Sequence, residues 1–183
     1  MAIGVSGAVS LAWAWAGAAA GVPVSFAVSG TAFKVSASRL EGDGFVQYAS
    51  FDTDQAGKSR PVAVTGIRSA ALRDVCQSVV TPTPLGPVTL RVAAGEESPV
   101  RIDDLVIDLE RMRGEITFRD LELGRDAADS RVRSAAGPPG VYSQQASHLV
   151  ILGLKQQTSS MTAGMFQLTG MRLSVSLGRH ECF

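Results

Sequence analysis

Apolar and polar residues alternate along most of the chain beyond residue 22. Residues 105–109 and 171–177, for example, carry an apolar side chain at every second position. Successive side chains of a β-strand point to opposite faces of a sheet, so this period of two is typical of strands with one buried face. Only residues 69–80 could form a short helix, and the β-branched residues at their end disfavour it. The pattern predicts an all-β protein.

The alternation changes phase at recurring glycines. In Val62–Arg68 the apolar residues stand at even positions before Gly66 and at odd positions after it, and Phe166–Arg172 repeats this change around Gly170. The residues on either side of Gly30 follow the same pattern. An extra residue that reverses the alternation is what a β-bulge or a tight strand corner produces, and glycine tolerates the positive φ found there. We therefore expect bulges or corners at these three glycines.

Two similar segments, Asp104–Ile107 and His148–Ile151, are each followed by a turn and then by a strand with such a phase change. This likeness predicts a quasi-repeated hairpin unit, although the phase changes are too unevenly spaced for a strict solenoid. We expect the bulged hairpins to build a curved two-sheet sandwich, an open groove or a short β-prism. Residues 22–183 would form this single domain, because a second one would be cramped.

The N-terminal segment has a different composition. The first ionisable side chain is Lys34, although 19% of all residues are charged. Residues 1–21 are small or apolar and end in overlapping A-x-A boxes, as in Ala18–Ala20, which are typical of a signal-peptide cleavage site. A basic n-region is missing, so we expect the true start to lie upstream of Met1. The alternatives are a retained membrane helix, for which about 20 apolar residues suffice, and a buried soluble segment.

The two cysteines, Cys76 and Cys182, are consistent with export. A cleaved signal and a membrane anchor both place the rest of the chain outside the cytoplasm, either extracellular or held at the outer face of the cytoplasmic membrane. In that compartment the two cysteines would most simply pair with each other. The bond would close a loop of roughly 100 residues and stabilise the fold by up to about 4–5 kcal/mol. Two unrelated buried thiols are the alternative.

The charged residues balance, with 17 basic and 17 acidic side chains and a formal net charge of zero. A nucleic-acid-binding domain normally shows a basic excess, so we expect no nucleic-acid partner. Hydrophobic residues make up 45% of the chain, which is too apolar for an intrinsically disordered protein. The composition therefore favours a folded domain that does not bind nucleic acid.

The sequence contains none of the common catalytic motifs. Only His148 and His180 could act as the base for a serine nucleophile, and no G-x-S-x-G elbow occurs. The P-loop pattern is also missing, and the two cysteines and two histidines lack the spacing of a metal site. We therefore expect a protein that is not an enzyme and that has no cofactor and no metal.

Acidic residues crowd the region from 103 to 122, but their spacing does not suit catalysis. Asp104 and Asp108 would share a strand face about 13 Å apart, too far for one metal ion or for a glycosidase pair. Cross-strand ion pairs with nearby arginines explain the pattern better. Asp52 and Asp54 resemble the start of a calcium loop, but Ala63 stands where the closing acid should be. A hairpin turn is the better interpretation there.

The remaining apolar residues either fill the core or line a groove for a lipid. The candidate core residues are Phe26, Phe33, Phe45, Phe118, Phe166, Leu168, Met171 and Leu173.

Several ordered segments of the chain resemble one family. They include F-A-V-S-G at residues 26–30, C-Q-S-V-V-T-P-T-P at residues 76–84 and the closing E-C-F at residues 181–183. The family is an uncharacterised exported family of actinobacteria, a domain of unknown function whose members are often labelled "cholesterol esterase". The resemblance covers residues 24–183. It implies an apolar export or anchor segment, a Cys76–Cys182 disulfide and a small multi-pass membrane protein as a candidate partner, but no catalytic residue.

Together these observations lead us to expect an exported, cell-envelope-associated protein that is not an enzyme. It would act by binding a membrane partner or by self-association. A lipid- or sterol-binding module is the alternative from a different class. An esterase is more distant, because the residues do not support that label.

Overall fold

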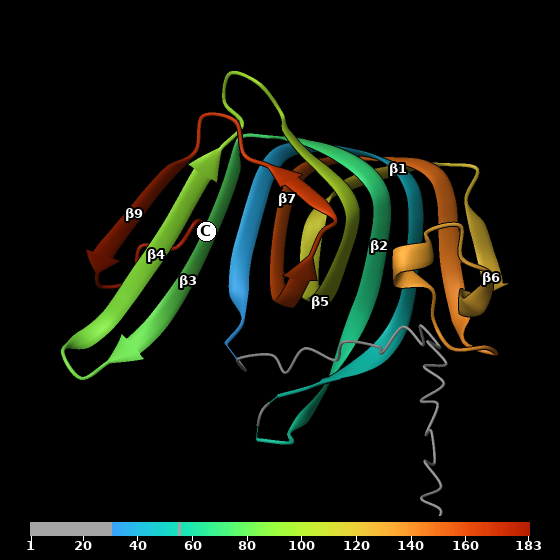
Figure 1. The fold of residues 1–183 in the computed structure, drawn as a ribbon, viewed down its shortest axis with the longest axis horizontal. Helices are drawn as coiled ribbons and strands as arrows, with labels where there is room; N and C mark the ends of the chain where they lie inside the picture. Colours follow the sequence, from blue (N-terminus) through green and yellow to red (C-terminus); the bar gives the residue numbers. More distant parts are fainter. Residues whose placement is uncertain (1–30, 55) are drawn as a thin grey trace, which may run out of the picture.

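The computed structural model describes residues 31–54 and 56–183. It confirms the all-β prediction, and residues 69–80 are strand rather than helix (Figure 1). The predicted export or anchor segment, Phe26 and Gly30 lie outside the described residues. Within the described part of the chain, no helix is long and apolar enough to cross a bilayer. The elements are β1 (Phe33–Thr53), β2 (Ser59–Arg73), β3 (Val75–Thr83), β4 (Gly86–Ala94), β5 (Val100–Arg119), β6 (Glu122–Asp126), the 3-10 turns η1 (Ala127–Asp129) and η2 (Arg133–Ala135), β7 (Tyr142–Thr162), β8 (Met165–Gln167) and β9 (Arg172–Leu177).

Four long antiparallel strands close into a ring. β1 pairs with β2 and β7, and β5 pairs with the same two strands from the other side. Figure 1 shows these strands curving around a common interior. That interior holds the main hydrophobic cluster, to which all four strands contribute and in which Leu105, Leu149 and Leu154 are almost fully buried. Each ring strand is therefore hydrogen-bonded along both edges and packed on its inner face.

The ring strands bend where the backbone adopts a positive φ. Gly44 in β1 and Asp104 in β5 have φ values of 68° and 50°, and the register places both beside Arg68 of β2, one on each side. A second pair of bends, at Gly114 in β5 and Gly153 in β7, lies where these two strands pair. Glycine adopts such values without a steric cost, and aspartate tolerates them better than most residues. These kinks let strands of 20 or 21 residues turn back over one core.

The phase change at Gly66 has a different cause from the expected bulge. The register of β2 with β1 and β5 is unbroken from Thr65 to Ile67. Instead, β2 is apolar on both faces, because Ile67 belongs to the main cluster and Val64 packs on a second cluster beneath the β6–β7 connection. A Cβ at Gly66 would lie 2.2 Å from the Cβ of Ala135 in η2, so the residue permits close packing. The prediction of a bulge or corner at Gly66 is therefore wrong.

The β6–β7 connection covers the outer face of the ring near its end. Ala127, Val132 and Ala135 from this connection are buried against Val46 and Tyr48 of β1. The predicted corner at Gly170, where φ is 64°, lies in the turn between β8 and β9 rather than inside a strand.

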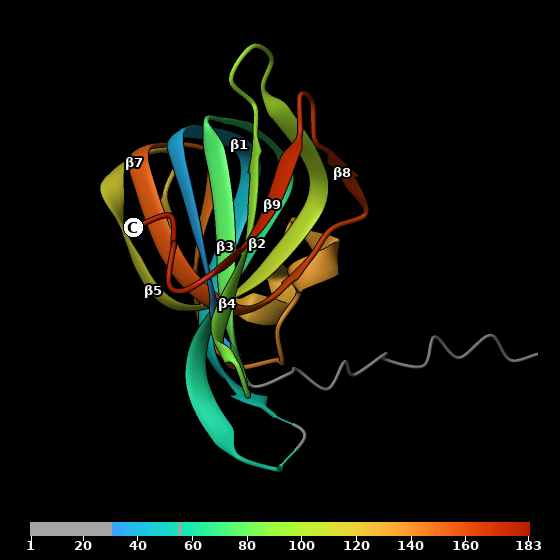
Figure 2. The ribbon, with the colours of Figure 1, turned by 90° about the vertical axis from the view of Figure 1, so that its left-hand side faces the viewer.

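A smaller sheet of three strands, which we call the flap, extends from the ring. It consists of β3, β4 and β9. β3 pairs with Lys34–Ser36 of β1, β4 pairs with β3, and β9 pairs with β4, while Val75 of β3 and Ala94 of β4 pack into the main cluster of the ring. Figure 2 views the molecule from the flap side, with the ring behind it. Among the described strands β9 is the last of the sheet, so in this part of the chain it is paired along one edge.

Candidate functional site

The C-terminal tail fastens one face of the flap. Cys76 in β3 and Cys182 form a disulfide with a Cα–Cα separation of 5.9 Å, which confirms the predicted pairing. The backbone amide of Cys182 also donates to Ser78 Oγ at 3.0 Å, and the amide of His180 donates to Thr89 Oγ1 at 3.0 Å. Ser78 and Thr89 are fully buried as a result. The tail therefore hydrogen-bonds with Ser78 and Thr89 and shields them from solvent.

The end of the tail is held by β1. Lys34 Nζ donates to the Phe183 carbonyl at 2.8 Å and forms an ion pair with Glu181 at 3.2 Å. The ammonium groups of Lys34 and Lys155 also lie over the Phe183 ring, at 5.2 and 5.8 Å from its centre. Cation–π contacts of this kind add to the ion pair. The first charged residue of the sequence thus anchors the last residue of the chain.

The other face of the flap is apolar and open. In the register of β4 and β9, Val88 pairs with Leu177, Leu90 with Val175, and Val92 with Leu173. The β9 side chains of this face are more than half exposed, at 57% for Leu173, 61% for Val175 and 70% for Leu177. We call this surface the apolar face. Its residues are Val79, Val88, Leu90, Val92, Leu173, Val175 and Leu177.

Part of the predicted core is therefore on the surface. Met171 and Leu173 were expected inside and are exposed, and Phe166 is 40% exposed. Alternation shows that one face of a strand is apolar, but burial depends on what packs against that face. No described segment of the chain covers the apolar face of the flap enough to bury its β9 residues. The other described members of the list, Phe33, Phe45, Phe118 and Leu168, do lie in or against the main core.

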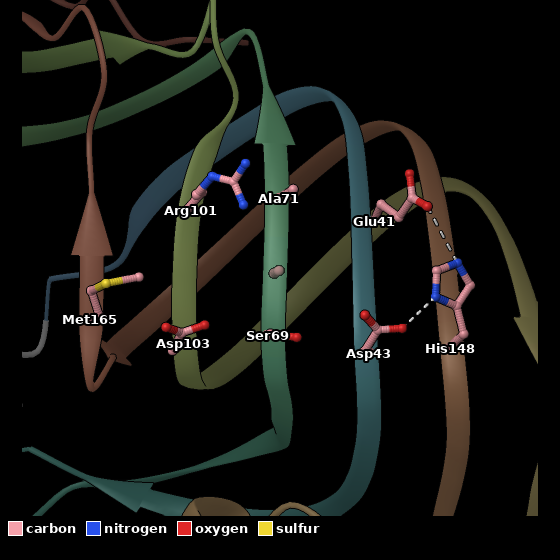
Figure 3. Close-up of a pocket in the computed structure, with 9 residues that line it drawn as sticks. Glu41, Asp43, Ser69, Ala71, Arg101, Asp103, His148 and Met165 are labelled. Carbon is pink, nitrogen blue, oxygen red and sulfur yellow. Dashed lines mark hydrogen bonds and ion pairs between the residues drawn. The ribbon is translucent and has the colours of Figure 1, made fainter.

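A polar depression of about 350 Å³ lies on the outer face of the ring. Residues of five strands line it, among them Glu41 and Asp43 of β1 and His148 of β7, which Figure 3 shows as sticks. His148 Nδ1 is 2.8 Å from Asp43 Oδ1, and its Nε2 is 3.7 Å from Glu41 Oε1. The imidazole is therefore held between two carboxylates, one on each ring nitrogen.

The order of side chains across the sheet does not form a serine–histidine–aspartate relay. Asp43 is opposite Ser69 of β2 on one side and opposite His148 of β7 on the other. A catalytic relay needs the histidine between the serine and the carboxylate, whereas here the carboxylate stands in the middle. His180 lies elsewhere, in the tail, with Nε2 at 3.0 Å from the Leu177 carbonyl oxygen.

Of the acidic residues between 103 and 122, Glu110 and Glu122 have ion pairs in the described part of the chain, with Arg60, Arg125 and Arg131 rather than with the arginines among them. Arg60 Nη1 of β2 lies 3.0 Å from Glu110 Oε1 of β5, and Arg60 Nη2 lies 3.7 Å from Asp54 Oδ2. Asp54 Oδ1 accepts from the amides of Ala56 and Lys58, which is the geometry of a hairpin turn. Among the described residues, no group of three or more His, Cys, Asp or Glu side chains could hold a metal ion.

One carboxyl of the ring has an altered pKa. Burial raises the pKa of Asp108, the nearby charge of Asp52 raises it further, and a hydrogen bond with Ser160 opposes the change. Burial and the charge of Asp108 also raise the pKa of Tyr48. These groups lie on the face of the ring that the β6–β7 connection partly covers, where water is less available to solvate charge.

The fold and these surfaces define a class: an all-β domain with a filled ring and an attached flap that carries an open apolar face. The chain belongs to the family of unknown function DUF6230, whose model matches residues 29–183. The resemblance to an uncharacterised domain family is thereby confirmed. No curated protein and no solved structure matches the chain.

Two features of these sites could not be read from the sequence. Asp43 and His148 are 105 residues apart, and no motif links them. The exposure of β9 depends on its place at the end of the sheet, which a period of two does not reveal. The cysteine pair, in contrast, was found because the sequence offers a single possible partner for each cysteine.

Proposed function

We propose that this protein is exported and acts at the cell envelope as a binding protein without catalytic activity. It contacts another protein, or a second copy of itself, through the apolar face of the flap. The observation that carries the proposal is the uncharged, exposed row Leu173, Val175 and Leu177, on a sheet whose opposite face is fastened by a disulfide. Exposed contiguous apolar surface on a folded domain is typical of an interaction site.

The interior of the ring is too small to hold a lipid, which favours the protein-binding proposal over the lipid alternative. The opening among the core side chains, lined in part by Leu40, Leu105 and Leu154, measures about 20 Å³. Ligand pockets for small molecules measure roughly 300–1,000 Å³. An acyl chain or a sterol ring therefore does not fit among these residues, so the lipid alternative would have to use the outer surface.

The charges around the flap also favour protein over lipid. Surfaces that lie on anionic membranes usually combine an apolar face with unpaired lysines or arginines at its rim. Here Arg172, next to the apolar face, is paired with Glu96, and Arg91 points its Nε at Cys76 Sγ on the opposite face. This arrangement gives little attraction to a lipid headgroup.

Export and a membrane partner complete the proposal. A disulfide that closes a loop of this length persists in an oxidising compartment, which supports a location outside the cytoplasm. The small multi-pass membrane protein implied by the family resemblance is then within reach of the apolar face. The N-terminal residue of the protein isolated from cells tests whether the first segment is cleaved.

The esterase alternative has the weakest support, because Asp43 separates Ser69 from His148. Turnover of a short-chain ester that disappears on His148→Ala or His180→Ala would overturn our proposal that the protein is not an enzyme.

The binding role is tested by site-specific photo-crosslinking of the full chain in the cells that produce it. A benzophenone amino acid replaces Leu90, on the apolar face, or Leu121, a matched control that is similarly exposed between β5 and β6. We expect Leu90, but not Leu121, to give an adduct whose mass identifies a second copy or one membrane protein. Equal labelling at both positions would contradict the proposal, and a lipid adduct at Leu90 would favour the lipid alternative.

A further inference from the structure

β9 has an edge that pairs with no other described strand. Within residues 31–54 and 56–183 it is the last strand of the sheet and pairs only with β4. Edge strands of soluble proteins are usually blunted by proline, lysine, a bulge or an inward-pointing charge. Residues 173–177 contain none of these residue types, and their register with β4 is regular. The exposed backbone of β9 can therefore accept another strand.

The sequence of this edge reads the same in both directions. Leu173-Ser174-Val175-Ser176-Leu177 is a palindrome centred on Val175. When two antiparallel copies pair about a two-fold axis through Val175, Leu173 stands opposite Leu177 of the second copy and Ser174 opposite its Ser176. Residues directly opposite each other share a face of the sheet, so apolar meets apolar and serine meets serine at every position. An isologous dimer needs this kind of self-complementarity.

The charged residues next to this segment are compatible with antiparallel pairing about Val175. Arg172 would stand opposite Gly178 of the second copy, and Met171 opposite its Arg179. The two Arg172 residues would be about six residues apart along the strands, or roughly 20 Å, so no like charges face each other. Arg172 is already paired with Glu96 within its own chain.

We propose that β9 pairs with β9 of a second copy, antiparallel and in register about Val175, which joins two flaps into one six-stranded sheet. This inference rests on the proposed binding function and identifies the binding partner as a second copy of the chain. β4 already covers one flank of Leu173, Val175 and Leu177, and the second copy covers the other. The two Ser174–Ser176 pairs stand on the opposite face, where hydroxyl groups can bond to each other. Because one strand buries little area, we expect a transient dimer.

Cysteine cross-linking of the full chain tests the register. Opposed residues of antiparallel strands have Cα atoms about 4.5–5.5 Å apart, within the range that a disulfide spans. Val175→Cys should therefore give a covalent dimer on mild oxidation. Ser174→Cys alone should cross-link at least fivefold less, because its opposite residue is Ser176. An equimolar mixture of Ser174→Cys and Ser176→Cys should restore the dimer.

Leu90→Cys is the matched control. It lies on the same apolar face, but the two copies would be three strand spacings apart, or about 14 Å, too far for a disulfide. Cross-linking of Val175→Cys no greater than that of Leu90→Cys would overturn the inference. More cross-linking at Leu90 would show stacked faces instead of paired edges. Peptide mapping of the Cys76–Cys182 bond confirms that each variant is folded.

A charge swap checks the same contact without added cysteines. Val175→Lys and Val175→Glu each place like charges opposite each other and should lower the dimer fraction of the full chain in native mass spectrometry at least fivefold. Mixing the two variants should restore a heterodimer. If neither variant changes the dimer, the inference fails. If no dimer forms while Leu90 still cross-links to a membrane protein, this inference fails and the proposed function stands.

Discussion

The ring and the flap use the same alternating strands with opposite outcomes. In the ring, every long strand is paired along both edges, and most of its buried apolar side chains lie either in the main cluster inside or in the second cluster beneath the β6–β7 connection. In the flap, the tail covers part of the polar face, and no described segment buries the β9 residues of the apolar face. The ring is a closed structure with a buried core, whereas the flap ends in an edge that pairs with no other described strand. A row of apolar side chains on a strand therefore becomes either part of a core or a contact surface, depending on whether the surrounding strands close into a ring.

The largest expected effect comes from removing the bond that holds the flap. The double substitution Cys76→Ala and Cys182→Ala should lower the free energy of unfolding by up to about 4–5 kcal/mol, because a long loop is no longer closed in the unfolded chain. Denaturant titration measures the loss. We also expect hydrogen exchange to increase first in β3 and β4, while β1 and β7 change little. Uniform loss of protection across ring and flap would show that the two regions do not differ in this way.

The same substitution in the two regions tests the comparison directly. Leu149→Ala, in the core of the ring, should cost about 2–5 kcal/mol of unfolding free energy, because it leaves a cavity. Leu173→Ala, on the apolar face, should change it by less than about 0.5 kcal/mol, because that side chain is exposed. Both values come from urea titration of the full chain under equal conditions. Similar costs at the two positions would mean that the apolar face is covered in solution.

Gly66 tests how tightly the ring is packed from outside. Gly66→Ala places a Cβ 2.2 Å from the Cβ of Ala135 and should cost about 1–3 kcal/mol through overpacking. Adding Ala135→Gly removes the clashing atom and should recover part of that loss. The thermal midpoints of the two single variants and the double variant, compared as a cycle, measure the coupling. Additive effects would show that η2 does not press on β2.

The smallest expected effect concerns the buried carboxyl of the ring. Because the pKa of Asp108 is raised in the folded state, the folded protein binds more protons than the unfolded chain between the unfolded and folded pKa values. Its ionisation therefore lowers stability as pH rises through that window. Asp108→Asn should raise Tm at pH 7 by at most a few degrees, because the carboxyl is only half-buried. The gain should vanish below about pH 3, where the carboxyl is protonated in both states. A gain that persists at low pH would assign the effect to packing.

Much of the fold could be predicted from local patterns. The period of two established strands in nearly every segment where it occurred, and the closing Cys182 could pair only with Cys76. The bends could not be placed as well. Gly66 was chosen for its phase change, yet the ring bends at Gly44 and Asp104, because a strand that is apolar on both faces produces the same phase change as a bulge.

The candidate sites were less predictable than the fold. His148 meets Asp43 only because β7 and β1 pair in one particular register, and a one-residue shift would turn the two side chains to different faces. Leu173 and Leu149 are the same residue type and both lie in strands, yet Leu173 is exposed and Leu149 is buried. Nothing within a strand distinguishes an inner strand of a closed ring from the last strand of a sheet.

The sequence by itself determined that this protein is all-β, that its two cysteines could join its middle to its end, and that Leu173–Leu177 is symmetric about Val175. These are properties of residue type and order, which need no knowledge of distant neighbours. Only the tertiary structure decided which apolar faces are buried, which edge stays unpaired, and that Lys34 holds Phe183 across 149 positions of the chain. Burial and edge pairing arise from contacts between remote strands, and those contacts exist only after the ring has closed.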